Sequence, residues 1–400
     1  MRVLHIVPSL NPASGGPSRT VPALCRALAG NGTEITLFST HVAGDALTID
    51  PAQEPYDVVL LPATDGSLAA ARRINKAIRA RVDDFDLIHL HSLWNLTVTW
   101  AAAAAREAKM PYVIAPRGML SETCLRQHHY GLKRAYAGTF DRQTVEGAAR
   151  LHFLNEDELR ASQNDWFRSP DHFLARNGVD LNMGGVRPGS FRARHPELKD
   201  RRIMLFLGRL HAIKGLDLQL RALQELTPKF PDLIWLLVGP DDGEWHRLDS
   251  LIKNMGLESH VKWLGPVMGD ERFSALADVD VLVQTSFYEC QSMTINEALA
   301  VGVPLVVTDS INYGEVQSAG AGYVVKSDPT ELAQAIERVL ASPDDGAAMR
   351  QAGRRFAAEE LEWSRIATKV NSAYGEALSG VVNRKEPDDV WRETRAGANA

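Results

Sequence analysis

The chain has 400 residues, of which 45% are hydrophobic and 24% charged, and its formal net charge is −6. This length exceeds what one hydrophobic core usually fills, so two domains of roughly 200 residues each are expected. The acidic balance argues against a nucleic-acid binder held by phosphate contacts, because such a protein needs a basic face.

The cysteines, Cys25, Cys124 and Cys290, lie far apart and form no C-x-x-C pair. A disulfide framework or a zinc site is therefore not expected, and a reducing cytoplasm fits best. The amino-terminal apolar run at 3–7 ends at Pro8 and is too short for a signal peptide. Because no stretch approaches the roughly 18 apolar residues of a membrane span, we expect a soluble cytoplasmic protein.

Short apolar runs alternate with amphipathic segments of helical length in the first half of the chain. Strands are expected at 3–7, 35–38, 58–61, 87–90, 112–115 and 151–154. Helices are expected between them at 19–29, 69–81, 96–108 and 156–163. Continuous apolar strands separated by helices predict a parallel sheet covered on both faces.

The alternation stops between 181 and 200, where glycines and prolines are mixed with arginines. We expect this segment to join an amino-terminal domain at 1–185 to a carboxy-terminal domain at 200–362. The predicted fold class is α/β, with two tandem Rossmann-like, doubly wound domains and a cleft between them.

The same alternation restarts in the second half. Strands are expected at 203–207, 234–238, 261–264, 279–283, 305–308 and 323–325. Helices are expected at 216–226, 245–254, 271–277, 294–301 and 331–340. A crossover helix at 363–379 is expected to return to the first domain, and the polar tail at 380–400 is expected to fray.

Three motifs carry the chemistry, and the first is the loop after the first strand. Its Gly15 and Gly16 let backbone N–H groups approach an anion, and the following helix N-terminus adds its positive dipole end. The loop is neither the dinucleotide fingerprint nor a P-loop, because the required spacings are missing. An ordinary strand-to-helix turn is the alternative interpretation.

The second motif, Gly208-Arg209-Leu-His-Ala-Ile-Lys214-Gly, follows the first strand of the second domain. Two cations at the carboxyl end of that strand can hold a diphosphate and offset the charge that develops as it leaves. A pair of solvent-exposed cations without a ligand is the alternative.

The third motif runs from Glu289 to Pro304 and contains a second glutamate, Glu297, eight positions later. The backbone N–H groups of Ser292, Met293 and Thr294 lie at an expected helix start, which suits a phosphate. Glu297 can accept both hydroxyls of a ribose, and Glu289 can accept hydroxyls of a sugar. Spacing alone is weak evidence, since solvated helices often carry two glutamates, but the Glu-Ala-Leu-Ala-x-Gly-x-Pro context is specific.

In this order and spacing, the three motifs resemble the retaining nucleotide-sugar glycosyltransferases of the family-four type, which have the GT-B fold. The resemblance implies that Arg209 and Lys214 hold the donor diphosphate and that the 263–267 segment reads the nucleobase. The implied donor-binding residues are Gly15, Gly16, Gly208, Arg209, Lys214, Gly265, Val267, Glu289, Ser292, Met293, Thr294 and Glu297. The implied catalytic residues are His91, Arg209, Lys214 and Glu289.

Two histidines, His89 and His91, lie two positions apart at the end of a first-domain strand. His91 matches the family histidine near the reacting sugar, where a neutral imidazole can bond a hydroxyl or order the leaving phosphate. His89 is expected to be a structural histidine beneath a helix. A metal site is not expected, because no carboxylate or third histidine follows at ligand spacing.

The acceptor side is expected to include Arg117, Asn95 and His129. Arg117 lies in Pro-Arg-Gly-Met-Leu, which resembles a motif of family members in polysaccharide assembly. The basic, aromatic stretch at 126–136 is expected to face either a lipid-linked acceptor and an anionic membrane surface or only solvent. Larger side chains at 290–292, where the family commonly has glycines, leave the donor sugar open.

The predicted function is retaining transfer of a hexose from a nucleotide-diphosphate sugar to a saccharide or lipid-linked saccharide in polysaccharide biosynthesis. The nucleotide sugar is a substrate, so no cofactor and no metal are expected. No nucleic-acid partner is expected. The enzyme is expected in the cytoplasm, with any contact at the inner membrane face being peripheral. The alternatives are a nucleotide-sugar epimerase on the same fold and a binding protein that has lost turnover.

Overall fold

The computed structural model describes residues 1–63, 67–121, 124–125, 136–163, 167–168, 170–182, 186–267 and 269–380. The chain divides into two compact units. The first comprises Met1–Arg176 together with the carboxy-terminal segment from Ser364, and the second comprises Asn177–Trp363.

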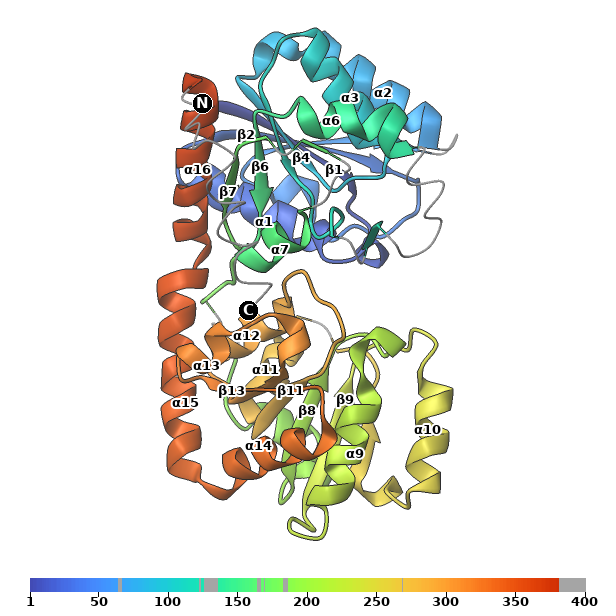
Figure 1. Ribbon diagram of the computed structural model, residues 1–400, viewed down its shortest axis with the longest axis vertical. Helices are drawn as coiled ribbons and strands as arrows, with labels where there is room; N and C mark the ends of the chain where they lie inside the picture. The colour runs from blue at the N-terminus through green and yellow to red at the C-terminus, as the bar shows by residue number, and fades with distance from the viewer. Residues whose placement is uncertain are drawn as a thin grey trace, which may run out of the picture. The chain divides into compact units, whose positions relative to one another are not determined.

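The first unit is built on a seven-stranded parallel sheet of order β3-β2-β1-β4-β5-β6-β7 (Figure 1). Its strands are β1 Arg2–Ser9, β2 Glu34–His41, β3 Asp57–Pro62, β4 Leu87–His91, β5 Tyr112–Ala115, β6 Arg150–Phe153 and β7 His172–Leu174. The order reverses between β1 and β4, which pair directly, His5 lying opposite His89. Ligands of doubly wound sheets bind outside the carboxyl ends of the strands at such a reversal.

The helices of the first unit are α1 Pro17–Gly30, α2 Ser67–Ala80, α3 Leu96–Glu107, α6 Arg142–Glu146, α7 Glu156–Ala161 and α16 Trp363–Ser379. Because side chains alternate along a strand, Leu4 and Ile6 of β1 pack with α2 and α3 in one apolar cluster. The carboxy-terminal α16 runs beside this sheet (Figure 1) and buries Tyr374 completely.

The second unit is built on a six-stranded parallel sheet of order β10-β9-β8-β11-β12-β13. Its strands are β8 Arg202–Leu207, β9 Leu233–Val238, β10 Val261–Trp263, β11 Val281–Gln284, β12 Leu305–Thr308 and β13 Gly322–Val325. Its helices are α8 Ser190–Arg194, α9 Leu216–Leu226, α10 Trp245–Asn254, α11 Asp270–Asp278, α12 Met293–Val301, α13 Glu315–Ser318, α14 Pro329–Ala341 and α15 Pro343–Phe356. The order reverses between β8 and β11.

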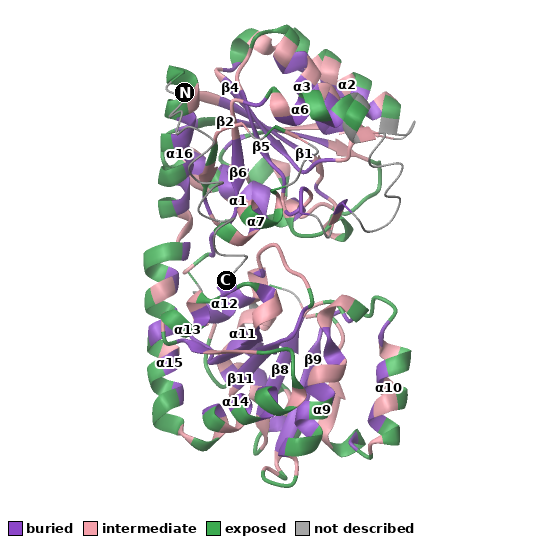
Figure 2. Cartoon of the chain, in the orientation of Figure 1, coloured by how far each residue is buried: buried purple, intermediate pink, exposed green. Residues whose placement is uncertain are grey.

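Both faces of the second sheet are covered, as continuous apolar strands require. Phe206 and Trp235 point to the side of α9, α10 and α14, whereas Leu205 and Leu236 point to the side of α11 and α12. Figure 2 shows this as buried strands between helices that are exposed on their outer faces. Two rigid layers of packing therefore fix the strand ends from which the candidate site loops emerge.

The division between the units falls after Arg176, nine residues before the expected end of the first domain at 185. The physical reason is that Val179 belongs to the core of the second unit and its N–H donates to the Leu361 carbonyl. Within the described part of the chain, no helix is long and apolar enough to span a membrane.

Candidate active site

The second and third motifs meet in the second unit at the reversal of strand order. The 208–215 loop follows β8, and the 285–292 loop follows its neighbour β11. Thr285 Oγ1 donates to the Lys214 carbonyl at 2.9 Å, and the Phe287 N–H donates to the Ile213 carbonyl at 2.9 Å. The two loops are therefore held together by hydrogen bonds to backbone carbonyls, one from a side chain and one from the backbone.

This arrangement brings Lys214 and Glu289 into an ion pair, although they are 75 residues apart in sequence. The side chain of Lys214 is only 16% exposed, and that of Glu289 is 17% exposed. Ser286 Oγ donates to the same carboxylate oxygen of Glu289 at 3.0 Å. A largely buried cation beside a carboxylate at a strand-order reversal is an arrangement that suits a charged ligand.

Two glycines are required for these loops to come together. Gly215 has φ +61°, and a Cβ there would lie 2.4 Å from the Thr285 carbonyl oxygen. Gly239, which follows β9, has φ +147°, and a Cβ there would lie 1.8 Å from the Gly208 carbonyl oxygen. Gly208 therefore lies against the backbone of Gly239, and this close approach fixes the start of the loop that carries Arg209.

Arg209 is more exposed than Lys214 and forms an ion pair with Asp242, in the loop after β9. The neighbouring Asp241 accepts hydrogen bonds from the N–H groups of Glu244 and Trp245, each at 3.0 Å. Asp241 thus holds the turn that leads into α10.

Glu297, one turn into α12, is buried and forms a 2.5 Å ion pair with Arg272 of α11. The helix begins at Met293, directly after Ser292, whose side chain makes no capping hydrogen bond. Thr294 Oγ1 donates to the Leu207 carbonyl at 3.3 Å. The α12 start therefore lies beside the carboxyl end of β8, and Arg272 is a charged neighbour of this site that no sequence motif indicated.

The side chain of Gln291 stands where the family commonly has a glycine, and the structure shows what it contacts. Its Oε1 accepts from the Asn177 N–H at 2.8 Å, and its Nε2 donates to the Asn177 carbonyl at 3.2 Å. Asn296 also donates to that carbonyl, at 2.9 Å. Gln291 is thus turned toward the first residue of the second unit and ties it to the loop that carries Glu289.

The expected nucleobase segment follows β10. Gly265 has φ +75°, and its carbonyl accepts from the Gly239 N–H at 2.8 Å. Val267 packs on the apolar cluster that contains α11 and α12. The segment is therefore tied to the β9 loop, whose backbone contacts Gly208.

In the first unit, Gly15 and Gly16 lie between β1 and α1, as expected. Gly15 has φ +88° and ψ −159°, a conformation available almost only to glycine. Gly16 has ordinary helical angles, φ −53° and ψ −47°, and nothing lies within 4 Å of the position of a Cβ. The backbone at 16 therefore tolerates a side chain, whereas the backbone at 15 does not.

Gly16→Ala tests whether this glycine serves a ligand. We expect about tenfold slower sugar transfer, because a methyl group there intrudes on an approaching donor phosphate. The free energy of unfolding should change by less than ~1 kcal/mol, since the alanine fits the backbone. Gly15→Ala is the contrasting variant, and it should lower the free energy of unfolding by about 1–3 kcal/mol. Unchanged transfer by a folded Gly16→Ala variant, measured with initial rates, would remove Gly16 from the donor site.

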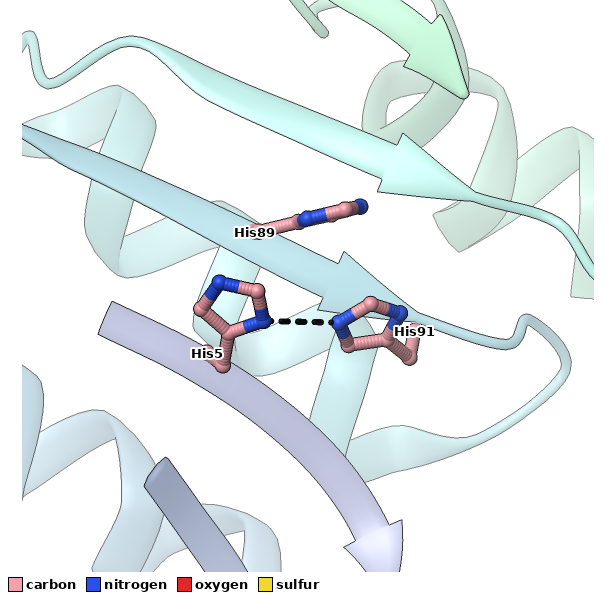
Figure 3. A group of neighbouring side chains, drawn as sticks. All are labelled: His5, His89 and His91. Atoms are coloured by element: carbon pink, nitrogen blue, oxygen red, sulfur yellow. Dashed lines mark hydrogen bonds between the residues drawn. The ribbon is translucent and has the colours of Figure 1, made fainter. Parts of the chain in front are cut away.

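His91 ends β4 and is completely buried, as is His89 two residues earlier. His89 Nδ1 lies 2.6 Å from the hydroxyl of Tyr374 on α16, so His89 is a structural histidine beneath a helix, as expected. A third histidine, His5 of β1, lies beside both (Figure 3), although none follows His91 at ligand spacing in the sequence. It comes from a neighbouring strand, which sequence spacing does not reveal.

The loops after β4 and β5 are bound to one another beside His91. Trp94 Nε1 donates to the Met119 carbonyl at 3.0 Å, and the Trp94 N–H donates to buried Asp141 at 3.2 Å. Burial raises the pKa of Asp141 to about 6. Trp94 and Arg117 both have positive φ, 55° and 57°, although neither is glycine. Such strain persists only where the surroundings enforce it, and it clusters at functional sites.

Arg117 lies within this strained region, and its guanidinium donates to His91 Nδ1 at 3.2 Å. The buried carboxylate of Glu158 accepts from the Gly118 N–H at 2.6 Å and holds the loop. Asn95 caps α3 by accepting from the Thr97 N–H at 2.8 Å, so its side chain has a structural role that the acceptor prediction overlooked. His129 and the 126–135 part of the basic stretch lie outside the described residues.

Two α/β domains with cationic and acidic groups at the strand ends are typical of glycosyltransferases of the GT-B class, and similarity to known families identifies that class. Residues 189–356 match the family described as glycosyl transferases group 1. Residues 15–178 match the glycosyl transferase 4-like domain. The chain belongs to these glycosyltransferases.

Similarity to individual proteins extends over nearly the whole chain. It is 25% identical to the D-inositol 3-phosphate glycosyltransferase of Paenarthrobacter aurescens, covering 95% of this chain and 98% of that protein. It is also 25% identical to glycogen synthase of Mycobacterium tuberculosis, covering 95% and 96%. Among solved structures, Anabaena Alr3699/HepE in complex with UDP superimposes with a TM-score of 0.76 at 19% identity, over 94% of this chain and all of that one. These similarities give no support to an epimerase.

Proposed function

We propose that the enzyme transfers a hexose from a nucleoside-diphosphate donor to a saccharide acceptor with retention of anomeric configuration and without a metal. The observation that carries the proposal is the ion pair of Lys214 with Glu289 at the reversal between β8 and β11. When the donor binds, Lys214 leaves the Glu289 carboxylate and binds the donor diphosphate. Glu289 then accepts hydrogen bonds from hydroxyls of the transferred sugar. Charge that develops on the leaving diphosphate is offset by Lys214 and Arg209.

The remaining second-unit residues have matching roles in this proposal. Glu297 accepts the ribose hydroxyls, and the backbone at 292–294 donates to phosphate at the start of α12. No carboxylate is assigned as a covalent nucleophile, so a front-face substitution is proposed in which the leaving phosphate takes the acceptor proton. The first unit supplies Gly16 for the donor, and His91 and Arg117 for the sugar hydroxyls and the acceptor.

A UDP-sugar is the first donor to test, because the Anabaena protein was solved with UDP and with UDP-glucose. A thermal-shift screen with UDP-, GDP- and ADP-glucose in EDTA is expected to raise Tm by about 2–4 °C with one nucleotide near 100-fold its Kd. Donor hydrolysis or transfer measured in the same buffer separates an enzyme from a binding-only protein. No shift with any nucleotide sugar, or activity lost in EDTA and restored by a divalent cation, contradicts the proposal.

A lipid-linked saccharide is the proposed acceptor, with peripheral contact at an anionic membrane surface. The basis is the basic stretch at 126–136 in a chain of net charge −6. Reversal of the charges of Lys133 and Arg134 should weaken sedimentation with anionic liposomes. Equal sedimentation of the variant and the wild type would reject membrane contact.

A further inference from the structure

Four histidines of the first unit lie on one face of its sheet, on three strands. They are His5 of β1, His89 and His91 of β4, and His152 of β6, each at most 1% exposed. Each is flanked by residues such as Leu4, Ile88 and Leu151 that point to the opposite face and pack with α2 and α3. Strand alternation therefore places all four imidazoles on the face where α16 lies.

The first half of the cluster begins at Arg117, which can only donate. Its guanidinium lies 3.2 Å from His91 Nδ1, so that nitrogen must accept and the proton of neutral His91 is on Nε2. His91 Nε2 lies 3.1 Å from His5 Nδ1 (Figure 3), so His5 accepts there in turn. His5 therefore carries its proton on Nε2, which lies 3.3 Å from the Tyr374 oxygen.

The second half ends at the Ala175 carbonyl, which can only accept. His152 Nε2 lies 2.7 Å from that oxygen, so His152 carries its proton on Nε2 and accepts at Nδ1. His89 Nε2 lies 3.4 Å from His152 Nδ1 and donates to it. His89 Nδ1 is then the acceptor for the Tyr374 hydroxyl at 2.6 Å.

Arg117 at one end and the Ala175 carbonyl at the other therefore require the same donor-to-acceptor direction along the chain of hydrogen bonds. Tyr374 joins the two halves by accepting from His5 and donating to His89. We call Arg117, His91, His5, Tyr374, His89, His152 and the Ala175 carbonyl the histidine relay. Burial keeps the four imidazoles and the phenol of the relay neutral. It lowers the pKa of His5 and His152 to about 3 and those of His89 and His91 well below 6.5, and the charge of Arg117 lowers all four further. Burial raises the pKa of the Tyr374 phenol well above 10, with a further contribution from Cys25 of α1.

We propose that the histidine relay holds His91 as its Nε2–H tautomer, so that His91 offers only a hydrogen-bond acceptor, Nδ1, to the reactants. The inference rests on the proposed function for the statement that His91 meets the sugar. A phosphate oxygen is also an acceptor and cannot pair with Nδ1. A sugar hydroxyl can donate to Nδ1 in place of Arg117. His91 therefore orients a hydroxyl of the substrate and does not bind the leaving phosphate.

The same geometry disfavours a metal ion at these histidines. The candidate ligand atoms of His5, His89 and His91 lie within 4.8 Å of one another. Each of these nitrogens, however, already has a partner within the relay. The cation of Arg117 lies beside His91, and the described residues place no carboxylate in the relay to offset a buried dication.

The tautomers can be measured directly in the full-length chain labelled with 15N-histidine. Two-bond 1H–15N correlation spectra are expected to show protonated Nε2 and unprotonated Nδ1 at all four relay histidines, unchanged from pH 6.5 to 8. Each is assigned by its loss in a single-site variant. An Nδ1–H tautomer or a charged ring at His91 overturns the proposal, as does one equivalent of zinc in the purified protein by elemental analysis.

Tyr374→Phe removes the hydroxyl that joins the halves. In the free enzyme Arg117 still donates to His91, so the tautomers should stay as they are. Once a sugar hydroxyl replaces Arg117, the Ala175 end no longer holds His91, and we expect a five- to tenfold lower kcat, with the donor KM within twofold. Tyr112→Phe is the matched control, because Tyr112 is equally buried and its hydroxyl donates to the Thr144 carbonyl at 2.8 Å, outside the relay. The control should keep the tautomers and kcat. A folded Tyr374→Phe variant with wild-type kcat overturns the relay. Normal tautomers in the wild type without any transferase activity would instead contradict only the proposed function.

Discussion

Lys214→Ala is expected to slow sugar transfer by about 10³-fold while leaving the fold intact. Fixed cations at a departing diphosphate stabilise charge that grows in the transition state, and their removal commonly costs this much. The fold should survive because Ser286 still donates to the partner carboxylate of Glu289. Steady-state turnover with the donor identified by thermal shift measures the effect, and circular dichroism with thermal melting checks the fold.

Lys229→Ala is the matched control for this substitution. Lys229 lies in the same unit and also forms an ion pair, with Glu337, but on the surface, where it is 57% exposed. Exposed ion pairs contribute little to the free energy of unfolding, and this pair is on the surface. Both turnover and stability of the variant should therefore stay near the wild-type values. Turnover of the Lys214→Ala variant within tenfold of wild type would refute its place at the diphosphate.

Glu289→Gln is expected to lower kcat about 100-fold without raising the donor KM. Glutamine keeps the shape of the side chain and the hydrogen bond from Ser286, but it removes the charge opposite Lys214. Lys214 then no longer has to leave a carboxylate before it binds the donor diphosphate. The hydroxyls of the transferred sugar, however, lose an anionic hydrogen-bond acceptor. The effect therefore falls on the chemical step rather than on binding.

A double-mutant cycle distinguishes this explanation from two independent losses. Because Lys214 and Glu289 are in contact, combining the two substitutions should cost far less than the product of the single effects. The cycle built on Lys229 and Glu337 provides the additive reference. Multiplicative losses at 214 and 289, or an unchanged kcat for Glu289→Gln, would show that the pair does not act as a unit.

The fold could be predicted from the sequence because the apolar runs are continuous and regularly separated. Helix α9 was predicted with its observed bounds, and the strand expected at 112–115 is β5. The edge strand β7, His172–Leu174, was missed, because three residues are too few to show a pattern. The boundary at Arg176 was also displaced, since Val179 joins the second core through pairing with a segment near residue 362.

The candidate site was predictable where its residues follow one another in a motif, and not where distant segments meet. Lys214 and Glu289 were named from separate motifs, but their ion pair follows only from the adjacency of β8 and β11. Arg272 carries no motif at all and is identified only by its contact with Glu297. The relay was detectable in part, because a polar histidine within each of several apolar strands is unusual. Its link through Tyr374, 369 residues after His5, was not.

The buried histidines also make the first unit sensitive to acid. In the unfolded chain each of these four histidines binds a proton below pH 6.5. In the folded chain burial lowers the pKa of His5 and His152 to about 3 and the pKa of His89 and His91 well below 6.5. Stability is therefore complete above pH 6.5 and falls as the pH decreases through that window. Each fully protonating histidine contributes about 1.4 kcal/mol per pH unit, so four together rapidly exhaust a typical margin of about 5–15 kcal/mol. The arrangement that keeps His91 neutral thus makes the first unit less stable as the pH falls below 6.5.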